Sequence, residues 1–254
     1  MAEGDTIRRA ALRIGGALEG QAVEVSAPNP RGRAAGVERL DGMRLERVDA
    51  HGKHLLLRFG DLVLHSHLGM SGSWHVYRHE ASWRKPPGAA WAVLRGKDAE
   101  AVQFGGPTLR VLAASVLRRD PMLARLGPDI LAVDFDPEPV ADSLRAAPDR
   151  AIGDALLDQR LLAGIGNIFK SEACFAARLD PWLPIGQLSD EQLRQVVHAA
   201  HEQMQAAVEN GRADRAVYRR KGQPCPRCAT PILSRGQGDA NRTTYWCPTC
   251  QLAR

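Results

Sequence analysis

The segment Leu156-Leu-Asp-Gln-Arg-Leu-Leu-Ala-Gly-Ile-Gly-Asn167 predicts two helices joined by a glycine-rich turn. Before the turn, residues 149–159 place apolar side chains on one face of a helix. After it, apolar residues recur with helical spacing as far as Ala176. Asn167 begins the second helix, where backbone N–H groups and the helix dipole favour an anion. The segment therefore predicts either a phosphate-binding turn or an ordinary helical hairpin with an asparagine cap.

Composition indicates a soluble, intracellular protein with a polyanionic partner. The 254 residues suffice for two domains and a small appendage, and no apolar run or basic–apolar leader suggests a membrane segment. The net charge is +5. Residues 212–254 hold nine Arg or Lys against two Asp, so this tail contains more than the whole positive excess.

The same tail carries two Cys-x-x-Cys pairs, Cys225-Pro-Arg-Cys228 and Cys247-Pro-Thr-Cys250, separated by eighteen residues. This spacing predicts one tetrahedral zinc site with four thiolate ligands and no open position, which is structural rather than catalytic. Residues 239–246 then predict a β-hairpin with Arg242 near its tip. Because zinc supplies the folding energy that a short segment lacks, Arg242 is expected to be presented rigidly to a partner.

The N-terminus combines a potential nucleophile with a carboxylate. Ala2 is small, so we expect Met1 to be removed and Ala2 to carry the free α-amine. Asp5 or Thr6 is expected to cap a helix that continues to Leu18. An α-amine has a pKa near 8, so it is unprotonated far more often than a lysine at neutral pH. With Glu3 beside it to move protons, it could attack an aldehyde or sugar carbon. The alternative is a disordered terminus with a capping glutamate.

Short β-rich runs separated by Gly, Asp and Pro extend from about residue 21 to residue 114, and they predict a β-sandwich or flattened barrel. Gly60-Asp61 predicts a tight hairpin turn. Lys53 stands where a loop enters a strand. Its side chain is either held over a neighbouring site or simply solvated at the strand edge. His65 and His67 alternate onto one face without a third metal ligand, so a phosphate contact by His67 is favoured over a metal site.

The loop 68–72 places Met70 between glycines, where it is awkward as a core residue. It is either a plain loop residue or an apolar wedge that fills a DNA stack from which a base has left. Further along, the proline-rich and acidic stretch before Val140 predicts a connection between domains. Ser189-Asp-Glu-Gln192 predicts a capping box for a helix that ends at Asn210-Gly211. Cys174 is expected to be a buried apolar residue.

The order and the residues of these motifs resemble those of the formamidopyrimidine-DNA glycosylase and endonuclease VIII (Fpg/Nei) family along nearly the whole chain. The first residues are similar to those of the endonuclease VIII branch. The matching motifs are Glu3-Gly4, Gly52-Lys53-His54, His67-Leu-Gly-Met-Ser-Gly72, Arg125-Leu-Gly-Pro128, Leu157-Asp-Gln159, Ala163-Gly-Ile-Gly-Asn167 and the two cysteine pairs.

The resemblance implies an α+β multidomain fold. Its expected parts are a catalytic β-sandwich domain with a leading helix (1–118), a linker (119–139), a helix–two-turn–helix DNA-binding domain (140–212) and a four-cysteine zinc-ribbon hairpin (213–254). It implies a monomer with one structural zinc ion and no organic cofactor. The location implied is cytoplasmic and nucleoid-associated in a bacterium, with no membrane partner.

The implied activity is that of a bifunctional DNA glycosylase and AP lyase of base excision repair. The partner would be damaged double-stranded DNA, with single-stranded or bubble DNA left open. The alternative is a catalytically weak or silent protein of the same fold that binds damaged DNA or abasic sites. The implied catalytic residues are Ala2, Glu3, Lys53 and Arg242, and the implied DNA-binding residues are His67, Met70, Asn167 and Arg242.

Three departures from the family pattern affect these expectations. Ala2 stands where proline is usual, so lyase activity is expected to survive, and whether it weakens stays open; Thr6 replaces a usual supporting glutamate. The Arg-Arg-Phe-Gly wedge of the formamidopyrimidine branch is absent, because residues 102–107 read Val-Gln-Phe-Gly-Gly-Pro. Oxidised pyrimidines are therefore expected as substrates rather than 8-oxoguanine. The preferred opposite base and the choice between β- and β,δ-elimination stay open.

Overall fold

The computed structural model describes residues 2–252 and divides into two compact units, Met1–Arg125 (unit 1) and Leu126–Arg254 (unit 2). The finer domain boundaries at residues 118, 139 and 212 stay predictions. Within the described residues, no helix has the length and apolarity needed to cross a membrane.

Unit 1 contains two four-stranded antiparallel sheets, with strand orders β1-β6-β7-β5 and β2-β3-β4-β8. Alternate side chains of both sheets share one apolar core, which confirms the predicted β-sandwich. The strands are β1 Glu24–Ser26, β2 Arg47–His51, β3 His54–Phe59, β4 Leu62–His67, β5 Ser73–Arg78, β6 Ala90–Arg95, β7 Ala99–Phe104 and β8 Thr108–Ala113.

The hairpin β3–β4 shows how the sequence sets the sheet. Gly60-Asp61 is its two-residue turn, as predicted, and Phe59 pairs with Leu62 across it. Leu55 and Leu57 face the main core, whereas Leu56 faces a second cluster under α3 (Ala114–Leu117). Both faces of this hairpin are therefore covered, which makes it a rigid support for the residues at its end.

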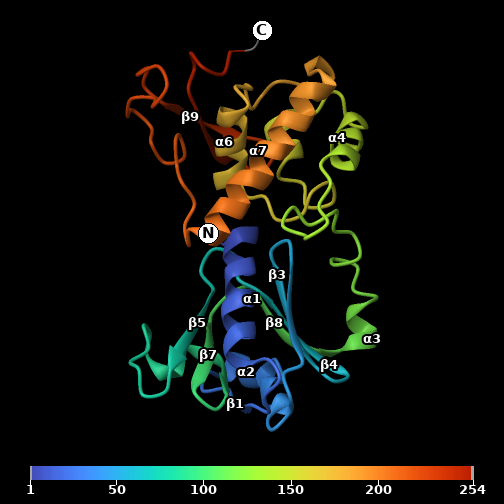
Figure 1. Cartoon of the computed structure of the whole chain (residues 1–254), viewed down its shortest axis with the longest axis vertical. Helices are drawn as coiled ribbons and strands as arrows, with labels where there is room; N and C mark the ends of the chain where they lie inside the picture. Colours follow the sequence, from blue (N-terminus) through green and yellow to red (C-terminus); the bar gives the residue numbers. More distant parts are fainter. Residues whose placement is uncertain (1, 253–254) are drawn as a thin grey trace. The chain divides into compact units, whose positions relative to one another are not determined.

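The leading helix α1 (Gly4–Leu18) contacts strands of both sheets, and Figure 1 shows it with β5 and β7 on one side and β3, β4 and β8 on the other. The predicted cap at Asp5 or Thr6 is wrong, because the helix begins at Gly4 and its N-cap residue is Glu3. Asp5 instead forms an ion pair with Arg9 at 2.8 Å, one turn along the helix. The other short helices of unit 1 are α2 Pro30–Ala34, η1 Val37–Leu40 and η2 Pro87–Ala89.

Unit 2 is built from helices around one core, with a hairpin at its C-terminal end. Its helices are α4 Glu138–Arg145, α5 Ile152–Ala155, α6 Asn167–Ala176, η3 Ile185–Gln187 and α7 Asp190–Glu209. The capping box at Ser189 and the end of α7 at Asn210 are confirmed. Cys174 is buried among apolar side chains, as predicted, and burial raises the pKa of its thiol to about 12.

The helix predicted over residues 149–159 is wrong in extent, since only α5 is helical there. Hydrogen bonds of polar side chains explain the difference. Arg150 forms an ion pair with Asp158 at 2.8 Å, and the side chain of Gln159 donates to the carbonyl oxygens of Leu157 and Ile165. These bonds satisfy the backbone in a turn rather than in a continued helix.

The C-terminal hairpin pairs β9 (Leu233–Gln237) with β10 (Arg242–Trp246), as the sequence predicted. A separate small cluster of Phe175, Val217, Ile232 and two cysteines lies beneath it. This cluster is too small to fold unaided, which is consistent with a metal-dependent segment.

Candidate nucleic-acid site

The N-terminal residues of the site are held at the start of α1. The backbone nitrogen of Ala2 donates to the carbonyl oxygen of Gly69 at 3.2 Å. Glu3 is only 1% exposed, although it stands at a helix N-terminus, where the dipole favours a carboxylate. Residue 2 is therefore anchored to a specific loop, with a carboxylate next to it.

That loop, Leu68–Gly72, is closed by a hydrogen bond from the Gly72 nitrogen to the Leu68 carbonyl oxygen at 2.8 Å. Gly69 has a φ of +57°, and a Cβ there would lie 2.8 Å from Pro107, so a side chain is excluded on both counts. Met70 is the middle residue of this loop and is 77% exposed. Its position suits an apolar wedge, and that role stays a prediction.

Lys53 lies in the two-residue turn between β2 and β3, where His51 pairs with His54. Gly52 supplies the positive φ (+55°) that the turn requires. Lys53 directly precedes His54, the cross-strand partner of His67, and burial first and the charge of Lys53 second lower the pKa of the His67 imidazole. The structure thus brings Lys53 and His67 together in unit 1.

Two residues that sequence reasoning did not assign to the site lie beside this pair. His54 is the cross-strand partner of His67, with ring centroids 4.9 Å apart. Both ring nitrogens of His65 have hydrogen-bond partners, since Nε2 lies 2.9 Å from His54 Nδ1 and Nδ1 accepts from Arg110. Neither nitrogen is therefore open to a metal ion. The predicted Gly60-Asp61 turn already fixes the pairing of His54 with His67, so this neighbour could have been found from sequence.

In unit 2, Asn167 is the first residue of α6, and Gly166 before it is extended. Gln159 holds the preceding turn, accepting from the Gly164 nitrogen at 3.0 Å. The Asn167 side chain donates to the carbonyl oxygen of Thr243 in β10 at 2.7 Å. The helix N-terminus and the C-terminal hairpin are therefore joined at Asn167.

A buried lysine, missed from sequence, reinforces this junction. Lys170 is 0% exposed, and its ammonium donates to Gln237 Oε1 at 3.2 Å and to the hydroxyl of Thr244. These partners lie on the two strands of the hairpin, so the lysine ties both strands to α6. Arg242, one position from the Asn167 contact, is exposed and borders a hollow of about 370 Å³.

The four cysteines fit a zinc ion. The Sγ atoms of Cys225 and Cys250 are 3.9 Å apart, those of Cys228 and Cys247 are 3.4 Å apart, and all four lie within 4.8 Å of one another. A tetrahedral zinc with ligand distances near 2.3 Å separates sulfurs by about 3.8 Å. Backbone N–H groups of Arg227 and Cys250 point at two of the sulfurs, each at 3.4 Å, which favours thiolates. Over residues 2–252, no other group of three or more side chains could hold a metal.

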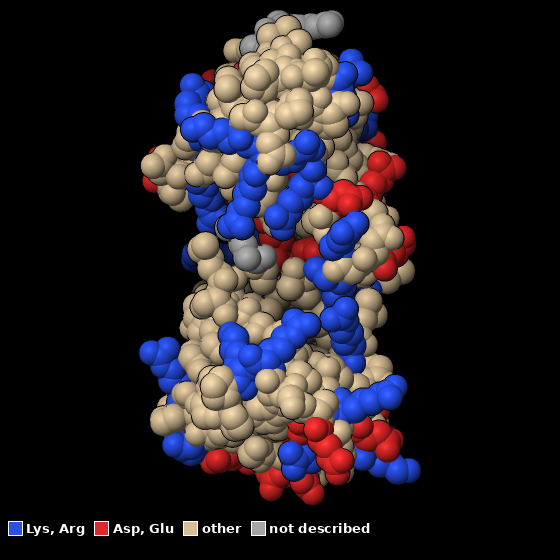
Figure 2. Space-filling model, turned by 90° about the vertical axis from the view of Figure 1, so that its left-hand side faces the viewer, with Lys and Arg blue, Asp and Glu red and all other residues tan. Residues whose placement is uncertain are grey.

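Basic side chains gather on the surface of each unit. Figure 2 shows Lys and Arg side chains gathered on the surface of unit 2 and, separately, on the surface of unit 1, with acidic side chains among and around them. In unit 2, Arg235 stacks on Trp182 with its guanidinium 4.1 Å from the ring centroid. Basic and aromatic surface of this kind suits a nucleic-acid backbone and its bases.

Comparison with known proteins supplies the family. Residues 1–107 match the model of the formamidopyrimidine-DNA glycosylase N-terminal domain, and residues 126–217 match that of the formamidopyrimidine-DNA glycosylase H2TH domain. Residues 222–253 match the zinc finger found in FPG and IleRS.

The relatives match over the full length. A probable endonuclease 8 2 of Streptomyces coelicolor is 41% identical, over 99% of this chain and 94% of that protein. A DNA-(apurinic or apyrimidinic site) lyase Nei2 of Mycolicibacterium smegmatis is 38% identical over 100% of both chains. The Lactococcus lactis formamidopyrimidine-DNA glycosylase, solved with DNA containing an AP site, has the same fold, with a TM-score of 0.84 at 23% identity over 99% of this chain and 100% of that one.

Proposed function

Because the chain belongs to the formamidopyrimidine-DNA glycosylase and endonuclease VIII family, we propose that it is a bifunctional DNA glycosylase and AP lyase of base excision repair. The observation that carries the proposal is the start of α1. There the nitrogen of residue 2 is anchored to the loop of Met70, beside the buried carboxylate of Glu3.

The chemistry assigned to this arrangement begins with the α-amine of Ala2, exposed by removal of Met1. The amine adds to C1′ of the damaged nucleotide as the bond from C1′ to the base breaks, and Glu3 supplies the proton that opens the sugar ring. The resulting Schiff base acidifies C2′. Loss of a C2′ proton sends its electron pair toward C3′ and expels the phosphate, and water then releases the amine.

Phosphate binding is assigned to residues of both units. In unit 1, Lys53 and His67 lie together, and a cation is required where the leaving phosphate gains charge. In unit 2, Asn167 and Arg242 flank Thr243, so the α6 N-terminus and the hairpin act on one segment of backbone. Met70 is assigned to the space that the extruded base leaves.

Oxidised pyrimidines are the proposed substrates, since residues 102–107 lack the Arg-Arg-Phe-Gly wedge. In this structure residues 102–104 belong to β7, and Gly105 and Gly106 have positive φ values. The stretch therefore offers no long side chains beyond Phe104 to read an opposite base. A bacterial cytoplasmic, nucleoid-associated location is proposed with this activity.

One experiment separates the enzyme from a silent binder of abasic sites. The protein is incubated with an abasic-site duplex and borohydride, with an undamaged duplex as the control. A covalent adduct with the abasic duplex alone supports the proposal. Binding of the abasic duplex without an adduct would reject the proposed enzyme in favour of the silent binder. The silent binder is the second candidate because Ala2 stands where the family usually has proline.

A further inference from the structure

Four hydrogen-bonded side chains lie in a row along the β2-β3-β4-β8 sheet of unit 1 and end at His54, the residue after Lys53. Arg110 of β8 is the cross-strand partner of His65 of β4, and its Nε donates to His65 Nδ1 at 3.1 Å. His65 Nε2 lies 2.9 Å from His54 Nδ1. Arg110 also forms an ion pair with Asp120. We call Asp120, Arg110, His65 and His54 the histidine network.

The network fixes where the imidazole protons lie. Arg110 has only donors, so His65 Nδ1 must accept and cannot carry a hydrogen. His65 is then neutral with its hydrogen on Nε2, which it donates to His54 Nδ1. The same reasoning makes His54 neutral with its hydrogen on Nε2. One guanidinium thereby sets the tautomers of two histidines in series.

The surroundings favour the same state. Burial, then the neighbouring histidines His65, His67 and His51, lower the pKa of His54 to about 3, although Asp120 opposes this. Burial and Arg110 lower the pKa of His65 to about 4, again opposed by Asp120 and assisted by His67. The charge of Lys53 acts on His67, whose ring centroid lies 4.9 Å from that of His54.

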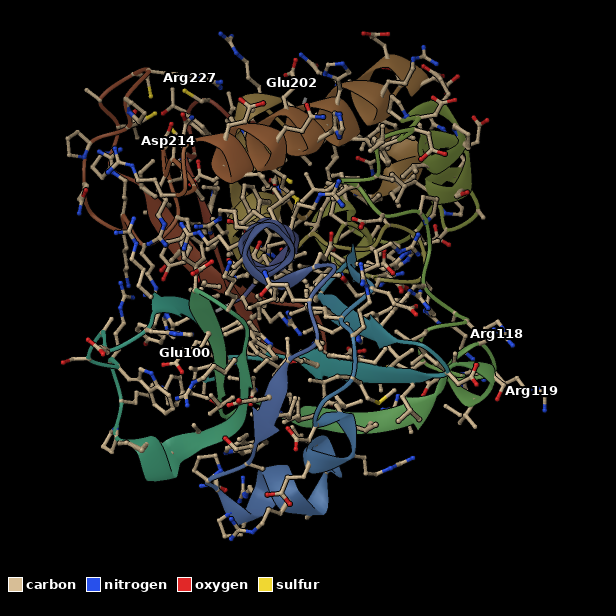
Figure 3. All side chains as sticks on the ribbon, turned by 60° about the horizontal axis from the view of Figure 1, so that its bottom comes forward. Glu100, Arg118, Arg119, Glu202, Asp214 and Arg227 are labelled. Atoms are coloured by element: carbon tan, nitrogen blue, oxygen red, sulfur yellow. The ribbon has the colours of Figure 1, made fainter. Side chains whose placement is uncertain are left out.

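Asp120 keeps Arg110 in place rather than neutralising the histidines. Its Oδ1 accepts from the backbone nitrogens of Met122 at 3.0 Å and Leu123 at 3.2 Å, and its Oδ2 accepts from Arg110. Arg118 and Arg119, just before it, project away from the sheet at the end of α3 (Figure 3). Asp120 is thus the one charged side chain of residues 118–120 that turns toward Arg110.

We propose that Asp120, Arg110 and His65 are positioning residues for the lyase step, which hold His54 in a single neutral tautomer. This immobilises the strand end that carries Lys53 and adds no positive charge beside it. A cationic His54 would place positive charge beside His67, on which the charge of Lys53 already acts, and a His54 free to rotate would loosen the turn. The inference rests on the proposed function, in which Lys53 assists elimination of the phosphate.

The first test is made on the free wild-type protein. Labelling with ¹⁵N-histidine reports the tautomer of each ring by NMR at neutral pH, with assignment by His54→Gln and His65→Gln. The expected result is a neutral ring with its hydrogen on Nε2 for both residues. A hydrogen on Nδ1 of either ring, or an imidazolium, would overturn the proposal without bearing on the glycosylase reaction.

The second test separates the two chemical steps in single-turnover assays, where alkali reveals base release and its omission reveals strand cleavage. Arg110→Met is expected to slow strand cleavage about tenfold while base release stays within about threefold, because only the Lys53 step is affected. Arg110→Lys, which keeps the charge but not the Nε donor, should behave similarly if Arg110→Met does not fold.

Arg58→Met is the matched control. Arg58 forms an ion pair with Asp49 in the same sheet, and its side chain is 34% exposed against 35% for Arg110. Both rates of this control should stay within about twofold of wild type, as for most exposed ion pairs. Equal slowing of both steps by Arg110→Met, or equal effects of the two variants, would overturn the proposal. Loss of the borohydride adduct in the wild type would instead reject the proposed function.

Discussion

Glu172 of α6 provides a direct test of how unit 2 holds the residues proposed to contact DNA. This carboxylate is buried, and its Oε1 accepts from the nitrogens of Val217 at 3.0 Å and Tyr218 at 2.7 Å, while its Oε2 accepts from Ala216 at 2.8 Å. Burial raises the pKa of Glu172, and the three N–H donors oppose the rise. The side chain therefore fixes the start of the zinc-binding segment to the helix that carries Asn167.

Glu172→Gln keeps Oε1 but turns an amide N–H toward the nitrogen of Ala216. One charged hydrogen bond is lost, but a neutral amide costs less to bury than a carboxylate, and this offsets part of the loss. We therefore expect the free energy of unfolding to fall by about 2 kcal/mol. Glu172→Ala removes all three bonds and leaves the nitrogens of Val217 and Tyr218 buried without partners. We expect a loss of about 3–6 kcal/mol, a large share of a domain's stability.

Urea unfolding of the zinc-loaded protein measures both losses. Glu202→Gln is the control, because Glu202 lies on α7 with its side chain 66% exposed, where it meets the exposed His198 one turn away at 3.3 Å (Figure 3). That control should change stability by less than about 0.5 kcal/mol. If Glu172→Gln unfolds at the same urea concentration as Glu202→Gln, the three hydrogen bonds do not hold the segment, and the reasoning fails.

Four further outcomes are expected. Glu3→Gln should abolish base excision and retain abasic-site binding, measured by product analysis and gel shift; unchanged excision would remove Glu3 from the mechanism. Ala2→Pro should speed strand cleavage by several-fold, because a secondary amine gives an iminium that needs no further proton; a slower reaction would contradict this. Cys247→Ser should lower zinc content and weaken DNA binding about tenfold or more, and full affinity without zinc would show that the hairpin is not a contact. His54 and His65 have folded pKa values of about 3 and 4 against 6.5 in the unfolded chain, so the unfolded state binds more protons in this range. Thermal stability should therefore fall as the pH drops from about 6.5 toward 3, with a shallower slope in a His54→Gln/His65→Gln variant.

Local signals in the sequence were enough for the elements that local chemistry determines. Gly60-Asp61 set the register of β3 and β4, Ser189-Asp-Glu-Gln192 set the start of α7, and the two cysteine pairs predicted the metal site that the sulfur positions fit. Each of these depends on residues that are close in the chain or have a fixed spacing. At these positions the local signal and the tertiary structure agree.

Some of the features that were missed depend on partners far away in sequence, and others depend on local hydrogen bonds that apolar periodicity does not show. Residues 149–159 read as a helix because periodicity does not reveal that Gln159 hydrogen-bonds a turn. Arg110 and Lys170 reach their partners only through strand pairing and through the docking of the hairpin on α6. Asp5 formed an ion pair with Arg9 instead of a cap, a choice between two local options of similar energy.

The central claim is that the nucleophile is a backbone nitrogen at the start of the chain, and peptide mapping of the borohydride-reduced DNA adduct tests it most directly. We expect the added mass on a peptide that begins with Ala2, at its α-nitrogen. An adduct on Lys53 or another lysine, or on a chain that still begins with Met1, would contradict it.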